Sequence, residues 1–232
     1  MAFFPNLNYY DFRQEGHRLE FNNPEDPNSG LLYKGVVYNE MKGAMSDPES
    51  AFVHKLNENL FKDSQYRFNS GGDPKYITDL QYSELVDFHK MYYHPTNANF
   101  FTYGDLDFTS HLKFVEEQVL KPNFKRNESV KKSELTLEQR LKQNLHKEEN
   151  FMPDLMSPAE TQAKLGIAFL CDILPAKDDY ESFCLNVLST ILLQGPNAPF
   201  YKAIIEEGIA PSFCPGAGFD STTRQPTFTI GV

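Results

Sequence analysis

The chain has 232 residues, a formal net charge of −10 and a sequence pI of about 5.1. This length suffices for one large domain or two ordinary ones with real cores. The acidic balance argues against nucleic acid or an anionic membrane as the main partner, and no run of residues is long and apolar enough to span a bilayer. Aromatic residues make up 14% of the chain, which excludes intrinsic disorder for most of it.

The cysteines indicate a reducing compartment. There are three of them, Cys171, Cys184 and Cys214, and no two form a C-x-x-C pair. An odd number without such pairs is not typical of a disulfide framework. We expect all three to be small buried hydrophobic side chains.

The first notable stretch is "LLYKGVVYNEMKGAMSDPES", residues 31–50, which follows a predicted loop at residues 18–30. Helical spacing places one carboxylate, Glu40, in the middle of an apolar face formed by Tyr33, Val36, Val37, Met41 and Ala44. A lone carboxylate in such a place costs several kcal/mol unless it is paired, protonated or bound to a metal. Glu40 is therefore either an ion-paired structural residue or a metal-binding or catalytic one.

The remaining elements of the first half alternate between helix and strand. A second helix follows Pro48, capped by Ser46 or Asp47. The paired glycines of residues 69–74 predict a loop. Further along we expect a helix at 82–92, a buried strand at 98–106 and a helix at 108–120.

Residues 121–160 are rich in charged residues and lack the hydrophobic periodicity of helices and strands. We interpret them as a linker with a short helical piece. Periodicity resumes with a strand at 163–173, a helix at 180–194, a helix at 198–208 and a terminal strand at 224–232. In the helix at 180–194 we expect four residues to point inward: Phe183, Val187, Leu188 and Ile191.

The predicted fold class is α+β, with two-layer α/β domains and mixed or antiparallel sheets. Residues 1–120 and 161–232 form the two domains, separated by the linker at 121–160. We expect the first domain to lack its beginning and the second its end.

Other candidate sites are weaker. "HRLEF" at residues 17–21 has the first four positions of an H-x-x-E-H zinc motif, but Phe21 stands where the second His ligand must be. His54 and Glu58 lie one helical turn apart and suit an exposed hydrogen-bonded pair. His94, before Pro95, suits a turn or a helix cap. The chain has no phosphate-loop pattern and no G-x-S-x-G nucleophile.

Four segments occur in order: "GVVYNEMKGA" (35–44), "SGGDP" (70–74), "YHPTNANFFTYGD" (93–105) and "GPNAPFYKAIIEEG" (195–208). Together they resemble the presequence proteases, organellar members of the pitrilysin/insulysin group of inverted-motif zinc metallopeptidases. The resemblance extends over essentially the whole chain and is weakest in the linker.

The resemblance implies that Glu40 is the distal zinc ligand. In that family two His of an H-x-x-E-H helix hold the same zinc, and the Glu of that motif activates the attacking water. No H-x-x-E-H occurs in these 232 residues, so the other two ligands are expected upstream. The resemblance thus implies no catalytic residue in this chain, which we expect to be inactive by itself.

The resemblance also implies a substrate class and a location. The substrates would be cleaved mitochondrial targeting peptides and other short unstructured peptides, degraded in the mitochondrial matrix inside a monomeric clamshell. It identifies no substrate-binding residue here. Two alternatives stay open: a noncatalytic peptide-binding or assembly subunit related to the peptidases, and an α/β domain whose Glu40 is merely ion-paired.

Overall fold

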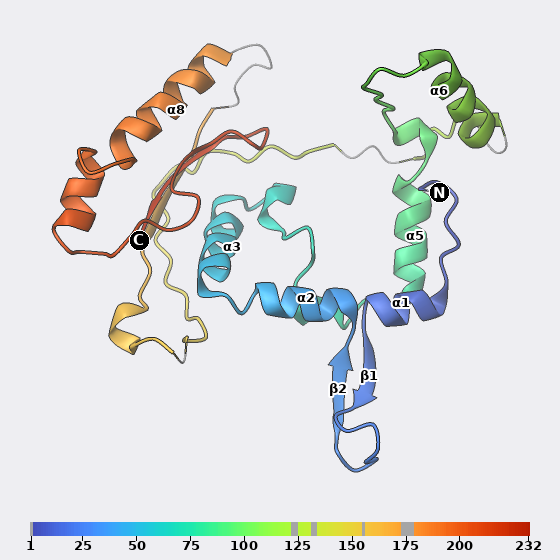
Figure 1. Ribbon diagram of the computed structural model, residues 1–232, viewed down its shortest axis with the longest axis horizontal. Helices are drawn as coiled ribbons and strands as arrows, with labels where there is room; N and C mark the ends of the chain where they lie inside the picture. The colour runs from blue at the N-terminus through green and yellow to red at the C-terminus, as the bar shows by residue number, and fades with distance from the viewer. Residues whose placement is uncertain (1, 122–124, 131–133, 155, 173–178) are drawn as a thin grey trace. The chain divides into compact units, whose positions relative to one another are not determined.

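The computed structural model (Figure 1) combines helices with antiparallel sheets, which confirms that part of the predicted fold class. Its contacts divide the chain into two compact units, residues 1–40 with 73–134 and residues 41–72 with 135–232. The predicted domain boundaries at 120 and 160 stay a prediction. The structure describes residues 2–121, 125–130, 134–154, 156–172 and 179–232.

The first unit begins with a short helix and a hairpin. Helix α1 (Tyr9–Glu15) is followed by strand β1 (Arg18–Phe21), which pairs antiparallel with β2 (Leu31–Lys34). The prediction of a loop over 18–30 is therefore wrong for its first four residues. They alternate half-buried and exposed positions and find a partner strand in 31–34, while the Asn- and Pro-rich residues 22–30 connect the two.

Two glycines fix how the hairpin leaves its flanking helices. Gly35 is buried between β2 and helix α2 (Val36–Ala44). A Cβ at Gly35 would lie 2.0 Å from the carbonyl oxygen of Gly16 and 3.0 Å from the Cα of His17. Only glycine permits so close an approach of two backbones. This contact holds the residues just before β1 against the residue that joins β2 to α2.

Gly35→Ala should destabilise the chain by roughly 1–3 kcal/mol, because the new methyl group would overlap a backbone carbonyl that cannot move as a flexible side chain can. Gly43→Ala is the matched control, since nothing lies within 4 Å of a Cβ built there. Within a helix that replacement should stabilise by about 0.5–1 kcal/mol. The midpoint of urea unfolding measures both, and equal effects would contradict the proposed close approach.

Two helical stretches of the first unit, at 82–92 and 108–120, follow the predicted ranges. Helix α5 spans Tyr82–Tyr92, the predicted range, and begins with a capping box between Gln81 and Glu84. His94 acts as the predicted cap, its Nδ1 accepting a hydrogen bond from the Thr96 N–H at 3.1 Å. The other helical segments are α4 (Pro74–Ile77), η2 (Pro95–Asn97), α6 (Phe108–Val115) and its continuation η3 (Glu116–Leu120).

The buried strand predicted at residues 98–106 is not present. The segment has no strand partner among the described residues, and Phe101 and Tyr103 are each 89% exposed. The apolar, aromatic composition that suggested a strand is real. A strand, however, exists only where a neighbouring backbone takes its hydrogen bonds.

The second unit is a sheet with helices on one face. The strands β3 (Gly166–Leu170), β5 (Thr227–Gly231) and β4 (Gly218–Asp220) pair antiparallel in that order, which confirms both predicted strands. Gly166 lies against Phe52 of helix α3 (Pro48–Leu60), and Gly218 lies against Ser189 of helix α8 (Asp179–Leu193). By the antiparallel register these two glycines share one face of the sheet. The unit also contains η1 (Gln65–Arg67), η4 (Ala159–Thr161) and η5 (Tyr201–Glu206).

Helix ends and helix faces differ in how well they were predicted. Asp47 caps α3, its side chain accepting a hydrogen bond from the Ser50 N–H at 2.8 Å. In α8 the inward prediction is wrong. Its contact with the sheet is made by Ser189 and Leu193, and the four residues predicted inward are all exposed: Phe183, Val187, Leu188 and Ile191. No helix in the described ranges is long and apolar enough to cross a membrane.

A buried carboxylate anchors the segment that was predicted as a linker. Glu138 is 7% exposed, and its Oε2 accepts hydrogen bonds from the N–H groups of Asp63 at 2.7 Å and Ser64 at 3.3 Å. The Gln225 side chain accepts from the Glu138 N–H at 2.6 Å and donates to its carbonyl at 2.9 Å. Glu138 therefore joins three parts of the unit: the segment that follows α3, the segment after residue 134 and the residues before β5.

Glu138→Ala should lower the free energy of unfolding by about 1–3 kcal/mol, because it leaves two backbone donors without an acceptor. Glu138→Gln keeps a carbonyl oxygen in place and should cost less. Glu148→Ala changes a side chain of the same segment that is 89% exposed and pairs with the equally exposed His146. It should stay within about 0.5 kcal/mol of the parent. Urea unfolding of the three variants tests this order, and a Glu138→Ala as stable as Glu148→Ala would contradict the anchoring role.

Candidate functional site

Glu40 lies on α2 and is exposed. The prediction of an apolar face around it is wrong because the chain up to Lys34 is a strand, so Tyr33 belongs to β2 and not to the helix. Val36 and Ala44 are also exposed. The buried side of α2 is centred on Met41, whose sulfur lies against Gly71. Glu40 is the neighbour of a core residue and does not itself enter the core.

The described residues do not form a zinc site by themselves. No group of three or more His, Cys, Asp or Glu side chains in the described ranges is arranged to hold a metal ion. One carboxylate is too few for zinc, which takes three or four protein ligands. Whether Glu40 serves as one ligand of a larger set stays a prediction.

Among the weaker candidate sites, His17 and Glu58 each have a hydrogen-bond partner within the protein. His17 of the "HRLEF" stretch is buried, and its Nε2 lies 2.9 Å from the carbonyl oxygen of Leu80. Glu58, predicted to pair with His54, accepts a hydrogen bond from Lys55 at 2.7 Å.

All three cysteines were expected to be buried. The structure buries Cys214, leaves Cys171 half-buried and exposes Cys184 on α8.

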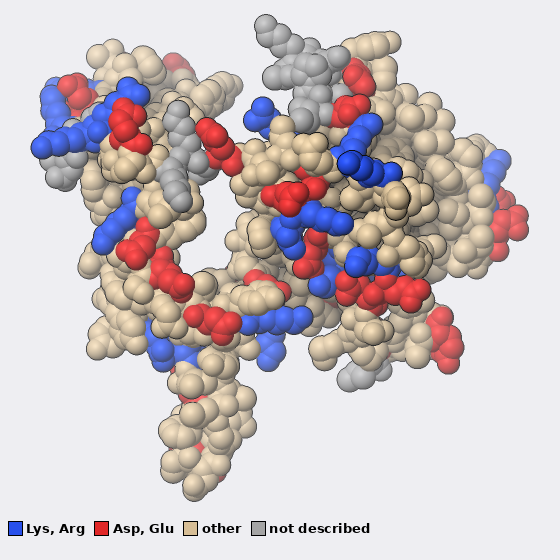
Figure 2. All heavy atoms as spheres, turned by 180° about the vertical axis from the view of Figure 1, so that it is seen from behind, with Lys and Arg blue, Asp and Glu red and all other residues tan. Residues whose placement is uncertain are grey.

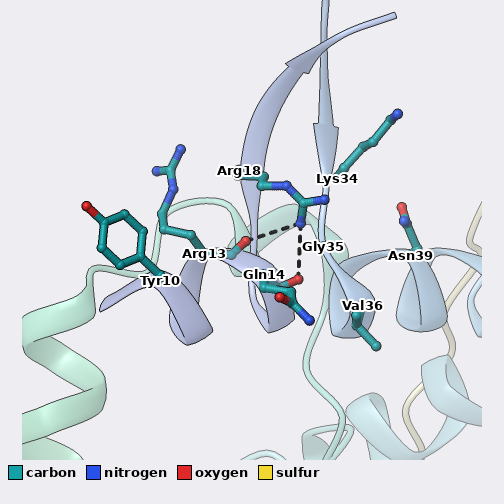
Figure 3. Close-up of a pocket in the computed structure, with 8 residues that line it drawn as sticks. All are labelled: Tyr10, Arg13, Gln14, Arg18, Lys34, Gly35, Val36 and Asn39. Carbon is teal, nitrogen blue, oxygen red and sulfur yellow. Dashed lines mark hydrogen bonds between the residues drawn. The ribbon is translucent and has the colours of Figure 1, made fainter. Parts of the chain in front are cut away.

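A pocket opens at the root of the hairpin, within the first unit. Its volume is about 550 Å³, and it is open to solvent, with the lining residues Tyr10 and Val36 themselves exposed. Figure 3 shows three basic side chains around it, Arg13 from α1, Arg18 from β1 and Lys34 from β2. The other lining residues are Tyr10, Gln14, Gly35, Val36 and Asn39.

Two of the basic side chains are held in place by the protein. Arg18 Nη1 donates to the carbonyl oxygens of Gln14 at 3.2 Å and Arg13 at 3.4 Å (Figure 3), and its Nε donates to Glu20 Oε1 at 2.5 Å. Lys34 Nζ lies 3.1 Å from the other oxygen of Glu20. The hydrogen bonds from Lys34 and Arg18 lower the pKa of the Glu20 carboxyl. Glu20 therefore stays ionised at neutral pH and orients both cations.

The third basic side chain is free of such partners. Within the described part of the chain, Arg13 donates no side-chain hydrogen bond and forms no ion pair. Figure 2 shows Lys and Arg side chains, with Asp and Glu side chains between them, where the hairpin joins the rest of the molecule. Sequence reasoning missed this pocket, because Lys34 lies 16 residues after Arg18 in an acidic chain and joins Arg13 and Arg18 in one lining only once the hairpin forms.

Comparison with known proteins places the chain in a family. The family model for the peptidase M16 inactive domain matches residues 79–232. The chain belongs to the peptidase M16 family. The M16 match begins after Glu40 and after the pocket, so both lie outside the matched segment.

The similarity to individual M16 proteins extends over the whole chain. It is 42% identical over 232 residues to the mitochondrial presequence protease of Xenopus tropicalis, covering 100% of this chain. The corresponding proteins of Mus musculus and Saccharomyces cerevisiae are 40% and 38% identical over 236 and 228 residues. In each case the matched region is 22% of the relative. The chain thus spans about a fifth of the length of these relatives and is homologous to presequence proteases throughout.

Proposed function

We propose that the chain is part of a zinc metalloendopeptidase that degrades targeting peptides and other short unstructured peptides in the mitochondrial matrix. The observation that carries the proposal is the identity of about 40% to mitochondrial presequence proteases over all 232 residues. A match over the whole chain includes the Glu40 helix as well as the segment of the inactive domain.

Within this proposal Glu40 is one zinc ligand. Its exposure on α2 supports the assignment, because a carboxylate that is neither in the core nor ion-paired in the described part of the chain can present its oxygens to a metal held from elsewhere. The metal would supply the activated water of the peptidase reaction. The remaining ligands and the general base must come from residues outside this chain.

Glu40→Gln in the protein at its natural length should remove most bound zinc and peptidase activity while leaving the fold intact. The amide keeps the size of the side chain but loses the charge that binds the cation. Zinc content by atomic emission and circular dichroism of the same sample provide the measurement. Glu25→Gln, an exposed change in the hairpin loop, is the matched control and should retain both zinc and activity.

Full zinc content in Glu40→Gln would remove Glu40 from the site. If the variant retained zinc but lost activity, Glu40 would not be a ligand, and its role would have to be sought in substrate contact.

The 232-residue chain by itself should not hydrolyse an unstructured peptide, because the described residues offer no complete metal site. The assay is cleavage of a fluorogenic peptide with and without a chelator. Turnover by the chain that a chelator abolishes would contradict the proposal that ligands and base lie elsewhere.

One observation favours a second candidate, a noncatalytic peptide-binding or assembly subunit. The segment from residue 79 onward matches a domain described as inactive. The two candidates differ in the protein at its natural length. A subunit of this kind would bind peptide but would contain no zinc and cleave nothing. The peptidase would contain zinc and cleave the peptide.

A further inference from the structure

We propose that the pocket at the root of the hairpin binds the C-terminal carboxylate of a peptide. The site consists of Arg13, Arg18 and Lys34 with the amide side chains of Gln14 and Asn39. Anion binding follows from the pocket itself, and only the choice of a peptide as the carrier of the anion rests on the proposed function. The site is separate from Glu40, which does not line the pocket.

The charges of the pocket select an anion. Three cations line it, and the one carboxylate in contact with them, Glu20, is shared between Arg18 and Lys34. Two positive charges are thus left in excess in a chain whose net charge is −10. A concave site with excess charge of one sign concentrates ions of the other sign.

The geometry favours a carboxylate at a fixed position. Arg18 is held by two carbonyl oxygens and by Glu20, so binding a ligand there orders no flexible side chain. The guanidinium of Arg13 has no ion-pair partner among the described residues and can offer two parallel N–H groups to a carboxylate. In Figure 3 the Arg13 side chain extends away from Arg18. The carboxylate would therefore bind at the unengaged Arg13, while the fixed Arg18 adds positive charge to the same pocket.

The rest of the lining suits the peptide attached to that carboxylate. Gln14 and Asn39 carry amides, which can donate to and accept from a peptide backbone. Tyr10 and Val36 lie at opposite ends of the lining (Figure 3), and each offers apolar surface to a side chain of the peptide. An inorganic phosphate would use the cations but would leave these amides and this apolar surface without a partner. The lining therefore favours a peptide over a free oxyanion.

The test compares a peptide acid with its amide on the protein at its natural length. The acetylated tetrapeptide Ala-Gly-Ala-Leu is titrated calorimetrically with a free C-terminus and with an amidated one, in excess chelator so that no cleavage occurs. The free acid should bind about tenfold more tightly, the size expected for hydrogen bonds to a charged group. Equal binding of the two forms, or binding of neither, would overturn the proposal.

Substitutions locate the binding. Arg13→Gln should weaken binding of the free acid about tenfold and leave binding of the amidated peptide unaffected. Arg13→Lys should have an intermediate effect, because lysine keeps the positive charge but lacks the two parallel N–H groups of the guanidinium. Lys42→Gln is the charge-matched control, since Lys42 is exposed on α2 and does not line the pocket. An equal loss in Lys42→Gln would mean long-range attraction only and would overturn the site.

A third experiment compares inorganic phosphate with the peptide acid as the anion that the pocket binds. Inorganic phosphate should compete more weakly than the peptide acid, and phosphate binding tighter than the acid would overturn the assignment to a peptide. The measurement requires neither zinc nor turnover. A protein that binds the acid without cleaving any peptide would therefore contradict the proposed peptidase and leave this inference standing.

Discussion

The contact between the backbones of Gly16 and Gly35 determines where the functional candidates of the first unit lie. Gly16 is the first residue after α1, and Gly35 is the single residue between β2 and α2. Because no side chain separates the two backbones, α1, both strands and α2 meet at one point. The pocket takes its lining from all four of these elements, and α2 also carries Glu40. A side chain at position 35 would overlap the Gly16 carbonyl and so push apart the backbones that meet at the pocket.

The physical rule that guided the interpretation of Glu40 is sound, but it applies to another residue. A carboxylate removed from water needs partners, and the structure contains one such carboxylate in Glu138. Its oxygen receives two backbone N–H groups, and its own backbone pairs with the Gln225 side chain. Glu138 sits in a charged stretch with no periodicity, so nothing in the local sequence marks it as buried. Its partners lie about 75 and 87 residues away and are brought to it only by the fold.

Local chemistry determined what could be predicted. The helix at Tyr82–Tyr92, the cap at Asp47 and the cap at His94 depend on neighbouring residues and were predicted correctly. Faces and strand pairing depend on remote residues. The aromatic segment at 98–106 has strand-like composition but no partner in the described part of the chain, and β1 was missed because its partner follows nine intervening residues. The zinc-ligand assignment of Glu40 came from family resemblance, whereas the basic pocket required the hairpin to be seen in three dimensions.

Three consecutive residues of α2 show how one helix can serve several purposes. Successive side chains on a helix point about 100° apart. Asn39 therefore lines the pocket, Glu40 faces solvent and Met41 packs into a core, although the three adjoin one another in the sequence. Rotating the helix to bury Glu40 would withdraw Met41 from its contact with Gly71 and turn Asn39 away from the pocket. With Met41 on the buried side of the helix, the Glu40 carboxylate is left on the exposed side.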